Sequence, residues 1–185
     1  QEYTNKFSIL NRKYISNNDH IEVIRLAFPL HPTALFLLPE FSSVFGQNER
    51  TLFTFLLDSS NNGLAGYVAR NDGFYYPDQL VDYFFTGNED KYNENLKEVT
   101  LFKKLYATLP TVFSNKLLLN AQRIFKFCLV WNITRSNNVY PLNTELISYS
   151  LDIPQEIVES CIIVFKNHKM IRQNIRKKYL EIYEA

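Results

Sequence analysis

Apolar residues recur at helical spacing along much of the chain, most regularly between residues 114 and 133. The apolar positions of this stripe are Leu117, Ala121, Ile124, Cys128 and Trp131. Residues three or four apart lie on one face of an α-helix. The spacing therefore predicts one long helix whose apolar face lies in the core.

Proline and glycine divide the N-terminal half into shorter helices. Pro32 suits the first turn of a helix, which is predicted to run to about Phe45 and to stop at Gly46. A second helix is predicted to begin at about Gln47. The residues expected on its apolar side are Leu52, Phe53, Leu56 and Leu57.

The region between these helices and the long helix contains shorter apolar segments. Helices are predicted over 64–70, 76–85 and 97–108. The last of them is expected to end before Pro110, because proline lacks the N–H that a helix interior requires. Residues 20–27 fit a short helix and a strand equally well, and the polar segment 86–95 predicts a flexible loop.

Beyond the long helix the pattern changes. Helices are predicted over 142–151 and 154–168, and two short strands over 169–175 and 179–183. Three helices followed by a hairpin is the element order of a winged helix. The predicted fold is therefore mainly α. It has a helical subdomain over 1–112 and a winged-helix-like subdomain over 113–185 that ends in a short β-hairpin.

Composition limits the class of protein. A hydrophobic fraction of 46% in 185 residues indicates a folded chain, and a net charge of +1 provides no overall field for nucleic acid or membrane. Cys128 and Cys161 stand among apolar helical residues, which predicts two reduced core thiols and a cytoplasmic location; a disulfide stays open. No apolar run approaches the roughly 20 residues of a spanning helix, so no membrane partner is expected.

Motifs for catalysis and metal binding are missing from the sequence. Neither G-x-x-x-x-G-K-[ST] nor G-x-G-x-x-G occurs, and the five glycines are scattered. The chain is therefore not expected to hydrolyse ATP alone or to be an enzyme by itself. His20, His31 and His168 show no metal-ligand spacing, so no metal site is predicted, and His31 is expected to form a hydrogen bond in the turn before Pro32.

A polar tetrapeptide interrupts the apolar segment 26–57. It consists of Gln47, Asn48, Glu49 and Arg50. An unpaired charge in a buried helix costs several kcal/mol, so Arg50 needs a partner. That partner is either a carboxylate such as Glu49 or Glu40, or a nucleotide phosphate held by a neighbouring domain.

Basic residues concentrate near the C-terminus. The candidates for nucleic-acid contact are Lys169, Arg172, Arg176, Lys177 and Lys178. A basic hairpin could lie on a phosphate backbone, but Glu156 and Glu159 stand in the first turns of the presumptive recognition helix. Sequence-specific DNA readout is therefore not expected. Nonspecific DNA contact by the wing stays open, and contact with a protein partner is favoured.

Two segments resemble one family of proteins. LHPTALFLLPEFSSVFGQNERTLFTFLLDSSNNGL at 30–64 resembles the region that follows the P-loop core in large bacterial ATPases of the AAA+/STAND type, some of them phage-defence proteins. Residues 117–171 resemble the winged-helix region that comes next in those proteins. The resemblance implies a segment that binds no cofactor itself and contacts a neighbouring core holding ATP and Mg²⁺. It implies nucleotide sensing by Arg50, with Asn48 and Glu49 fixing its orientation.

Three functions follow from these patterns. The first is a regulatory segment of a larger P-loop ATPase, which couples nucleotide state to a partner interaction. The second is a DNA-binding winged-helix module with a basic wing. The third is a protein-interaction scaffold without a ligand.

Overall fold

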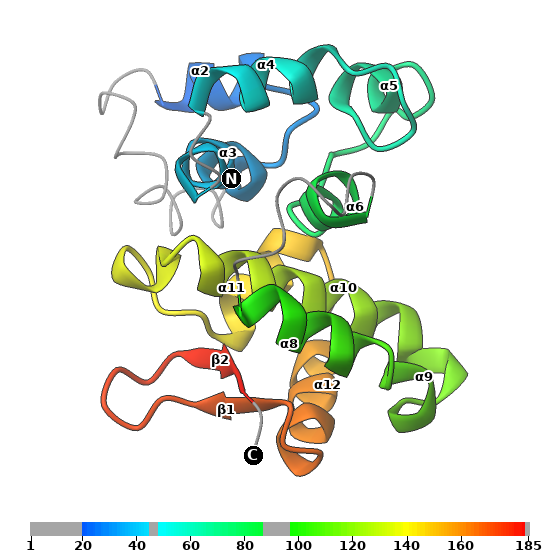
Figure 1. Ribbon diagram of the computed structural model, residues 1–185, viewed down its shortest axis with the longest axis vertical. Helices are drawn as coiled ribbons and strands as arrows, with labels where there is room; N and C mark the ends of the chain where they lie inside the picture. The colour runs from blue at the N-terminus through cyan, green and yellow to red at the C-terminus, as the bar shows by residue number, and fades with distance from the viewer. Residues whose placement is uncertain (1–19, 45–47, 87–96, 184–185) are drawn as a thin grey trace.

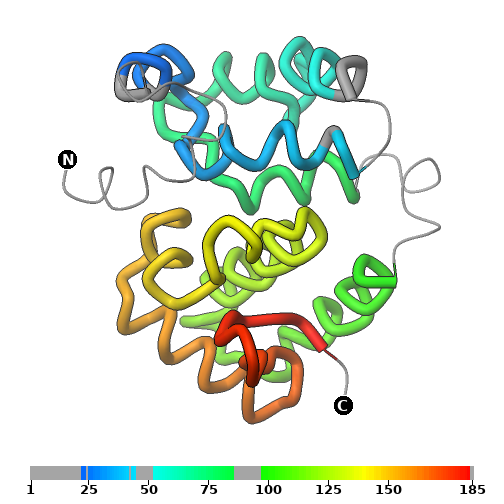
Figure 2. The backbone as a smooth tube through the Cα atoms, turned by 90° about the vertical axis from the view of Figure 1, so that its left-hand side faces the viewer, coloured from blue at the N-terminus to red at the C-terminus, as the bar shows by residue number. Residues whose placement is uncertain are grey.

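The computed structural model of the chain describes residues 20–44, 48–86 and 97–183. Its helices form two stacked layers, which stay separate in two perpendicular views (Figures 1 and 2). The first layer contains α2 (His20–Leu26), α3 (Pro32–Val44), α4 (Asn48–Leu57), α5 (Leu64–Val68) and α6 (Gln79–Thr86). The second layer contains α8 (Lys97–Tyr106), α9 (Leu109–Val112), α10 (Asn115–Ile133), the 3₁₀ turn η2 (Ser136–Asn138), α11 (Thr144–Leu151), α12 (Gln155–Asn167), β1 (Ile171–Gln173) and β2 (Leu180–Ile182).

Helix α10 is the central element of the second layer. It packs against α8, α9, α11, α12 and β2, and it also reaches α3 and α6 of the first layer. Ala121, Ile124, Cys128 and Trp131 are fully buried, which confirms these four positions of the predicted stripe, and Leu117 is partly buried. The buried indole N–H of Trp131 donates to the Tyr140 carbonyl at 3.0 Å, so the polar atom of this large core residue is satisfied.

The two layers meet through α3 and α6 on one side and α10 and α11 on the other. At this junction the hydroxyls of Thr33 and Ser150, both fully buried, share a hydrogen bond of 2.9 Å. Helices α2, α4 and α5 lie on the far side of the first layer (Figure 1). Their outer faces are therefore turned away from the second layer.

The C-terminal hairpin is tied to the rest of the second layer by hydrogen bonds. Strands β1 and β2 pair antiparallel, with Ile171 opposite Ile182. The side chain of Asn132 in α10 donates to the Leu180 carbonyl at 3.2 Å and accepts from the Ile182 N–H at 3.0 Å. The Leu180 N–H in turn donates to the Leu142 carbonyl at 2.9 Å, so the segment before α11 runs beside β2.

Most predicted elements are confirmed. The chain is mainly helical and ends in a small antiparallel hairpin, as predicted. Pro32 begins α3, and residues 20–27, which the pattern left open, form the helix α2. Gly46 and residues 87–95 of the predicted loop lie outside the described residues.

One detail of the prediction is wrong. Phe55 is the fully buried residue of α4, whereas Phe53 and Leu57 are 59% and 76% exposed. Apolar residues lie on several sides of this helix, so periodicity alone could not select which side is buried. The Phe55 ring packs against those of Tyr75, Tyr83 and Phe84. Helix α8 ends at Tyr106, before Pro110, as predicted; Pro110 itself stands in the first turn of the short helix α9, where a missing N–H costs nothing.

Candidate functional site

The exposed face of α4 carries apolar side chains that the fold does not bury. Phe53, Thr54 and Leu57 are exposed along this helix and line a shallow hollow together with Asp58. Position 50 precedes them by three, four and seven residues, which is the spacing of one helix face. We call the surface formed by Phe53, Thr54 and Leu57 the α4 outer face.

The three predicted nucleotide-sensing residues begin this helix. Asn48, Glu49 and Arg50 belong to the first turn of α4, and their side chains lie outside the described residues. The predicted pairing of Arg50 with Glu49 or Glu40 therefore stays a prediction. By its spacing along α4, position 50 lies on the same helix face as the exposed Phe53 and Leu57.

Two ion pairs join the layers, and we call them the interlayer clamp. The Arg123 Nε lies 3.0 Å from Asp78 Oδ2, and the Lys126 Nζ lies 2.6 Å from Asp82 Oδ1. Arg123 also donates to the Leu151 carbonyl at 3.0 Å, which caps the end of α11. Asp78 is only 4% exposed, and burial raises its pKa against the opposing effect of Arg123.

No sequence pattern predicts this clamp. Its partners stand 44 and 45 residues apart, and nothing in either helical pattern marks the acidic residues as buried. Only the packing of α6 on α10 brings them together.

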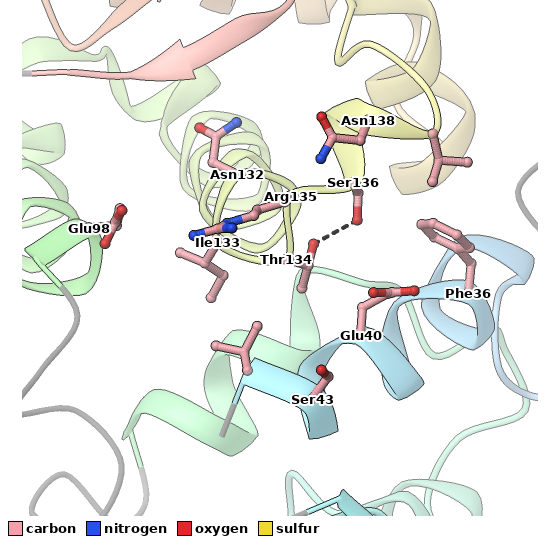
Figure 3. A pocket seen from close by; sticks show the side chains of 12 residues that line it. Phe36, Glu40, Ser43, Glu98, Asn132, Ile133, Thr134, Arg135, Ser136 and Asn138 are labelled. Carbon is pink, nitrogen blue, oxygen red and sulfur yellow. Dashed lines mark hydrogen bonds between the residues drawn. The ribbon is translucent and has the colours of Figure 1, made fainter. Parts of the chain in front are cut away.

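A polar cavity of about 560 Å³ opens between the ends of α3, α8 and α10 (Figure 3). The Thr134 and Ser136 hydroxyls of its buried wall share a hydrogen bond of 2.7 Å, and Thr134 also donates to the Val130 carbonyl. Glu40 and Glu98 line the cavity together with the guanidinium-bearing Arg135. Because its buried hydroxyls are satisfied by the protein and its charges have both signs, the cavity selects no single class of ligand.

The hairpin loop presents most of the predicted basic residues to solvent. The Asn174 side chain accepts from the N–H groups of Arg176 and Lys177 at 3.1 and 3.0 Å, which fixes the loop. Lys169, Arg176, Lys177 and Lys178 are exposed, and within the described part of the chain none of them forms an ion pair. We call these four residues the basic wing.

The fifth predicted residue, Arg172, is already engaged. Its Nε lies 2.7 Å from Glu181 Oε1 on the paired strand, and its guanidinium lies 5.0 Å above the centre of the Tyr183 ring. Arg172 therefore has partners within the hairpin, and its contact with a phosphate stays a prediction.

The acidic residues of α12 lie at its other end. Glu156 and Glu159 are exposed in the first turns, and Gln155 donates to Glu159 at 2.9 Å. Eight residues separate Glu159, the nearer of the two acids, from Asn167 at the end of α12, or about 12 Å along the helix, and Lys169 of the basic wing lies beyond that end. This exceeds the Debye length of about 8 Å at physiological salt, so the acids only weakly oppose a phosphate at the basic wing.

His31 lies at the base of a groove between the layers. It is 6% exposed, and its Nδ1 accepts from the Thr33 N–H at 3.2 Å, as predicted for a hydrogen-bonding turn residue. Burial lowers its pKa to about 4, against a smaller opposing effect of a hydrogen bond with the Tyr149 backbone. The imidazole is therefore neutral at pH 7.

The thiols and the metal-ligating residues provide no reactive centre. Cys128 and Cys161 are free and buried, and burial raises their pKa values to about 12 and about 11. Over residues 20–44, 48–86 and 97–183, no three His, Cys, Asp or Glu side chains are grouped to hold a metal ion. At neutral pH the two cysteines therefore carry thiols and not the thiolates that attack as nucleophiles.

Comparison of the chain with protein-family models, with curated proteins and with solved structures finds no match. None of the three therefore assigns a role to any residue. Across the described helices, none combines the length and the apolar character that crossing a membrane requires.

Proposed function

We propose that this chain is a non-catalytic regulatory segment that docks on a nucleotide-binding core through the α4 outer face. The observation that carries the proposal is the exposure of Phe53 and Leu57 on the face that begins at position 50. Burying such side chains against a partner contributes about 1.5–3 kcal/mol each. An apolar pair that shares a helix face with position 50 suits a docking surface whose charged edge reaches a phosphate.

The chemistry of Arg50 fits the charged edge of that surface. A guanidinium is charged at all physiological pH values and can donate two parallel hydrogen bonds to phosphate oxygens. The core would hold ATP and Mg²⁺, because this sequence has no phosphate-binding loop. Asn48 and Glu49 would orient Arg50, as the resemblance to P-loop ATPases implies.

The interlayer clamp supports transmission to the second layer. Asp78 and Asp82 join α6 to α10 through Arg123 and Lys126, so the layers are linked by charges as well as by apolar packing. A displacement of the first layer on its core would therefore move α10 with it. Nucleotide state would reach a partner in this way.

We infer a winged-helix-like arrangement for the second layer. The order α10, α11, α12, β1, β2 supports it. The hydrogen bond from the Leu180 N–H to the Leu142 carbonyl also supports it, because a winged helix would have a further strand beside β2 before α11. The partner that binds this layer would be a protein or a nucleic-acid backbone.

The test uses the gene product that contains this chain. We expect Arg50→Ala to reduce ATP turnover at least tenfold while thermal unfolding stays unchanged, and Arg50→Lys to restore only part of it. Lys116→Ala, an exposed cation in α10, is the matched control and should leave turnover unchanged. Full turnover in folded Arg50→Ala, or a gene product without a phosphate-binding loop, would overturn the proposal.

A second function is favoured by the basic wing. Four exposed cations without an ion-pair partner among the described residues suit a nucleic-acid backbone. The probe is a duplex of about 20 base pairs, measured by fluorescence anisotropy at several salt concentrations. Neutralising Arg176, Lys177 and Lys178 to Gln should reduce the slope of log K against log salt by about 2.7.

The control for this measurement is a variant in which exposed lysines elsewhere are neutralised. Lys97→Gln combined with Lys116→Gln removes two cations from α8 and α10 and should leave the slope unchanged. Equal slopes of log K against log salt for the wild type and the wing variant would contradict duplex binding by the basic wing. Contact with a protein would then be the proposed function of the second layer.

A further inference from the structure

A groove of about 460 Å³ runs along the junction of the two layers, on a different surface from the α4 outer face and the basic wing. Its first wall is the segment before α6, which contributes Phe74 and Tyr76. Its second wall is the end of α11, which contributes Tyr149, and the turn from α11 to α12, which contributes Asp152 and Pro154. We call this surface the aromatic groove, with His31 at its base.

The groove is aromatic on three sides. The ring centres of Phe74, Tyr76 and Tyr149 lie 5.6, 5.7 and 5.0 Å from that of His31. Phe74 is 41% exposed, and its ring meets that of Phe28, itself exposed, at 5.5 Å. Exposed aromatic rings offer the negative face that attracts a cation within about 6 Å.

The charges around the groove favour a cation. Asp152 is exposed at its rim, and its Oδ2 lies 3.5 Å from the Tyr76 hydroxyl. The nearby Arg123 stacks on the Tyr76 ring at 5.0 Å, but Asp78 already neutralises its charge. The base is uncharged, because burial lowers the pKa of His31 to about 4.

We propose that the aromatic groove binds one cationic side chain, lysine or arginine, from a protein partner, between the Phe74 and Tyr149 rings and the Asp152 carboxylate. The rings would accommodate the apolar stem, and the carboxylate would pair with the charged end. A single side chain at an open groove is expected to bind with a Kd on the order of 1 mM.

The first measurement titrates the ¹⁵N-labelled chain with small probes and follows its amide spectrum. The cationic probes are Nα-acetyl-lysine amide and Nα-acetyl-arginine amide, and the uncharged isostere is Nα-acetyl-norleucine amide. We expect the cationic probes to shift the amides of 74–76 and 148–153, with norleucine binding at least tenfold more weakly. Equal binding by norleucine, or shifts confined to other regions, would overturn the proposal.

Asp152→Asn gives the sharpest variant. Asp152 has a φ of 53°, a left-handed conformation that asparagine also tolerates, so the substitution removes the charge and leaves the turn intact. We expect a tenfold loss of lysine binding, whereas Glu98→Gln, an exposed acid outside the groove, should have no effect. If Asp152→Asn and Glu98→Gln bind the lysine probe equally well, the groove does not recognise charge. This outcome does not depend on whether a harsher variant such as Phe74→Ala folds.

Discussion

At the scale of single residues, His31 illustrates how burial decides a protonation state. The side chain is 6% exposed and is held by a hydrogen bond from the Thr33 N–H. Charging the ring would place a positive charge among aromatic side chains, and burial accordingly lowers its pKa from 6.5 to about 4. Folding is therefore linked to the release of a proton below neutral pH.

The linkage predicts a loss of stability in acid. The unfolded chain binds a proton at His31 near pH 6.5, whereas the folded protein does so near pH 4. The contribution of neutral His31 to the free energy of unfolding is thus complete above pH 6.5. It falls by about 3 kcal/mol as the pH is lowered to about 4. Urea unfolding from pH 7.5 to 4 measures it.

His31→Asn provides the control for that measurement. Its side-chain oxygen can accept the Thr33 N–H in place of Nδ1 but cannot titrate. The difference in unfolding free energy between wild type and this variant should shrink by about 3 kcal/mol over the same pH range, with other acidic groups cancelling. A pH-independent difference would mean that His31 titrates normally in the folded protein.

At the scale of elements, one amide attaches the hairpin to the long helix. Asn132 uses both ends of its side chain, as a donor to Leu180 and as an acceptor from Ile182. Strands of three residues make few ladder bonds of their own, so they depend on such external contacts. The position of the basic wing therefore depends on α10.

Asn132→Ala should loosen the hairpin. Losing two hydrogen bonds to partly buried backbone groups is expected to lower the unfolding free energy by about 2 kcal/mol. In the variant, the Leu180 and Ile182 amides should exchange with solvent faster than they do in the wild type, whereas the exchange of the α10 amides should not change. Hydrogen exchange measures both. Equal protection of these amides in both proteins would show that the apolar contacts of β2 suffice.

At the scale of the whole molecule, the interlayer clamp makes the two layers interdependent. Asp78 is buried with Arg123, and removing one partner leaves the other charge without compensation. Leaving a buried charge unpaired costs more free energy than the intact pair contributes to stability. The junction is therefore sensitive to substitutions that an exposed ion pair would tolerate.

Asp78→Ala tests this directly. We expect a loss of about 3 kcal/mol in the free energy of unfolding, measured in urea. Glu22→Ala breaks the exposed Glu22–Arg25 pair at 2.6 Å and should cost less than about 0.5 kcal/mol. Similar losses for the two variants would mean that Arg123 reaches solvent when Asp78 is gone.

The sequence alone determined the helical character of the chain and the position of its long helix. The stripe from Leu117 to Trp131 and the breaks at Pro32 and Ser136–Asn138 are local signals, since they depend on spacing and backbone chemistry within a few residues. The exposed basic residues of the hairpin loop were also predictable, because long charged side chains rarely lie in a core.

Only the tertiary structure decided which side of α4 is buried, and which acids meet which bases. Apolar residues lie on several sides of α4, and only packing selected Phe55, whose ring meets those of Tyr75, Tyr83 and Phe84, over the exposed Phe53. Asp78 and Arg123 look like any surface acid and base in the sequence, and Phe74 and Asp152 lie 78 residues apart in the chain. Their proximity comes from the stacking of the two layers, a long-range arrangement that local spacing does not encode.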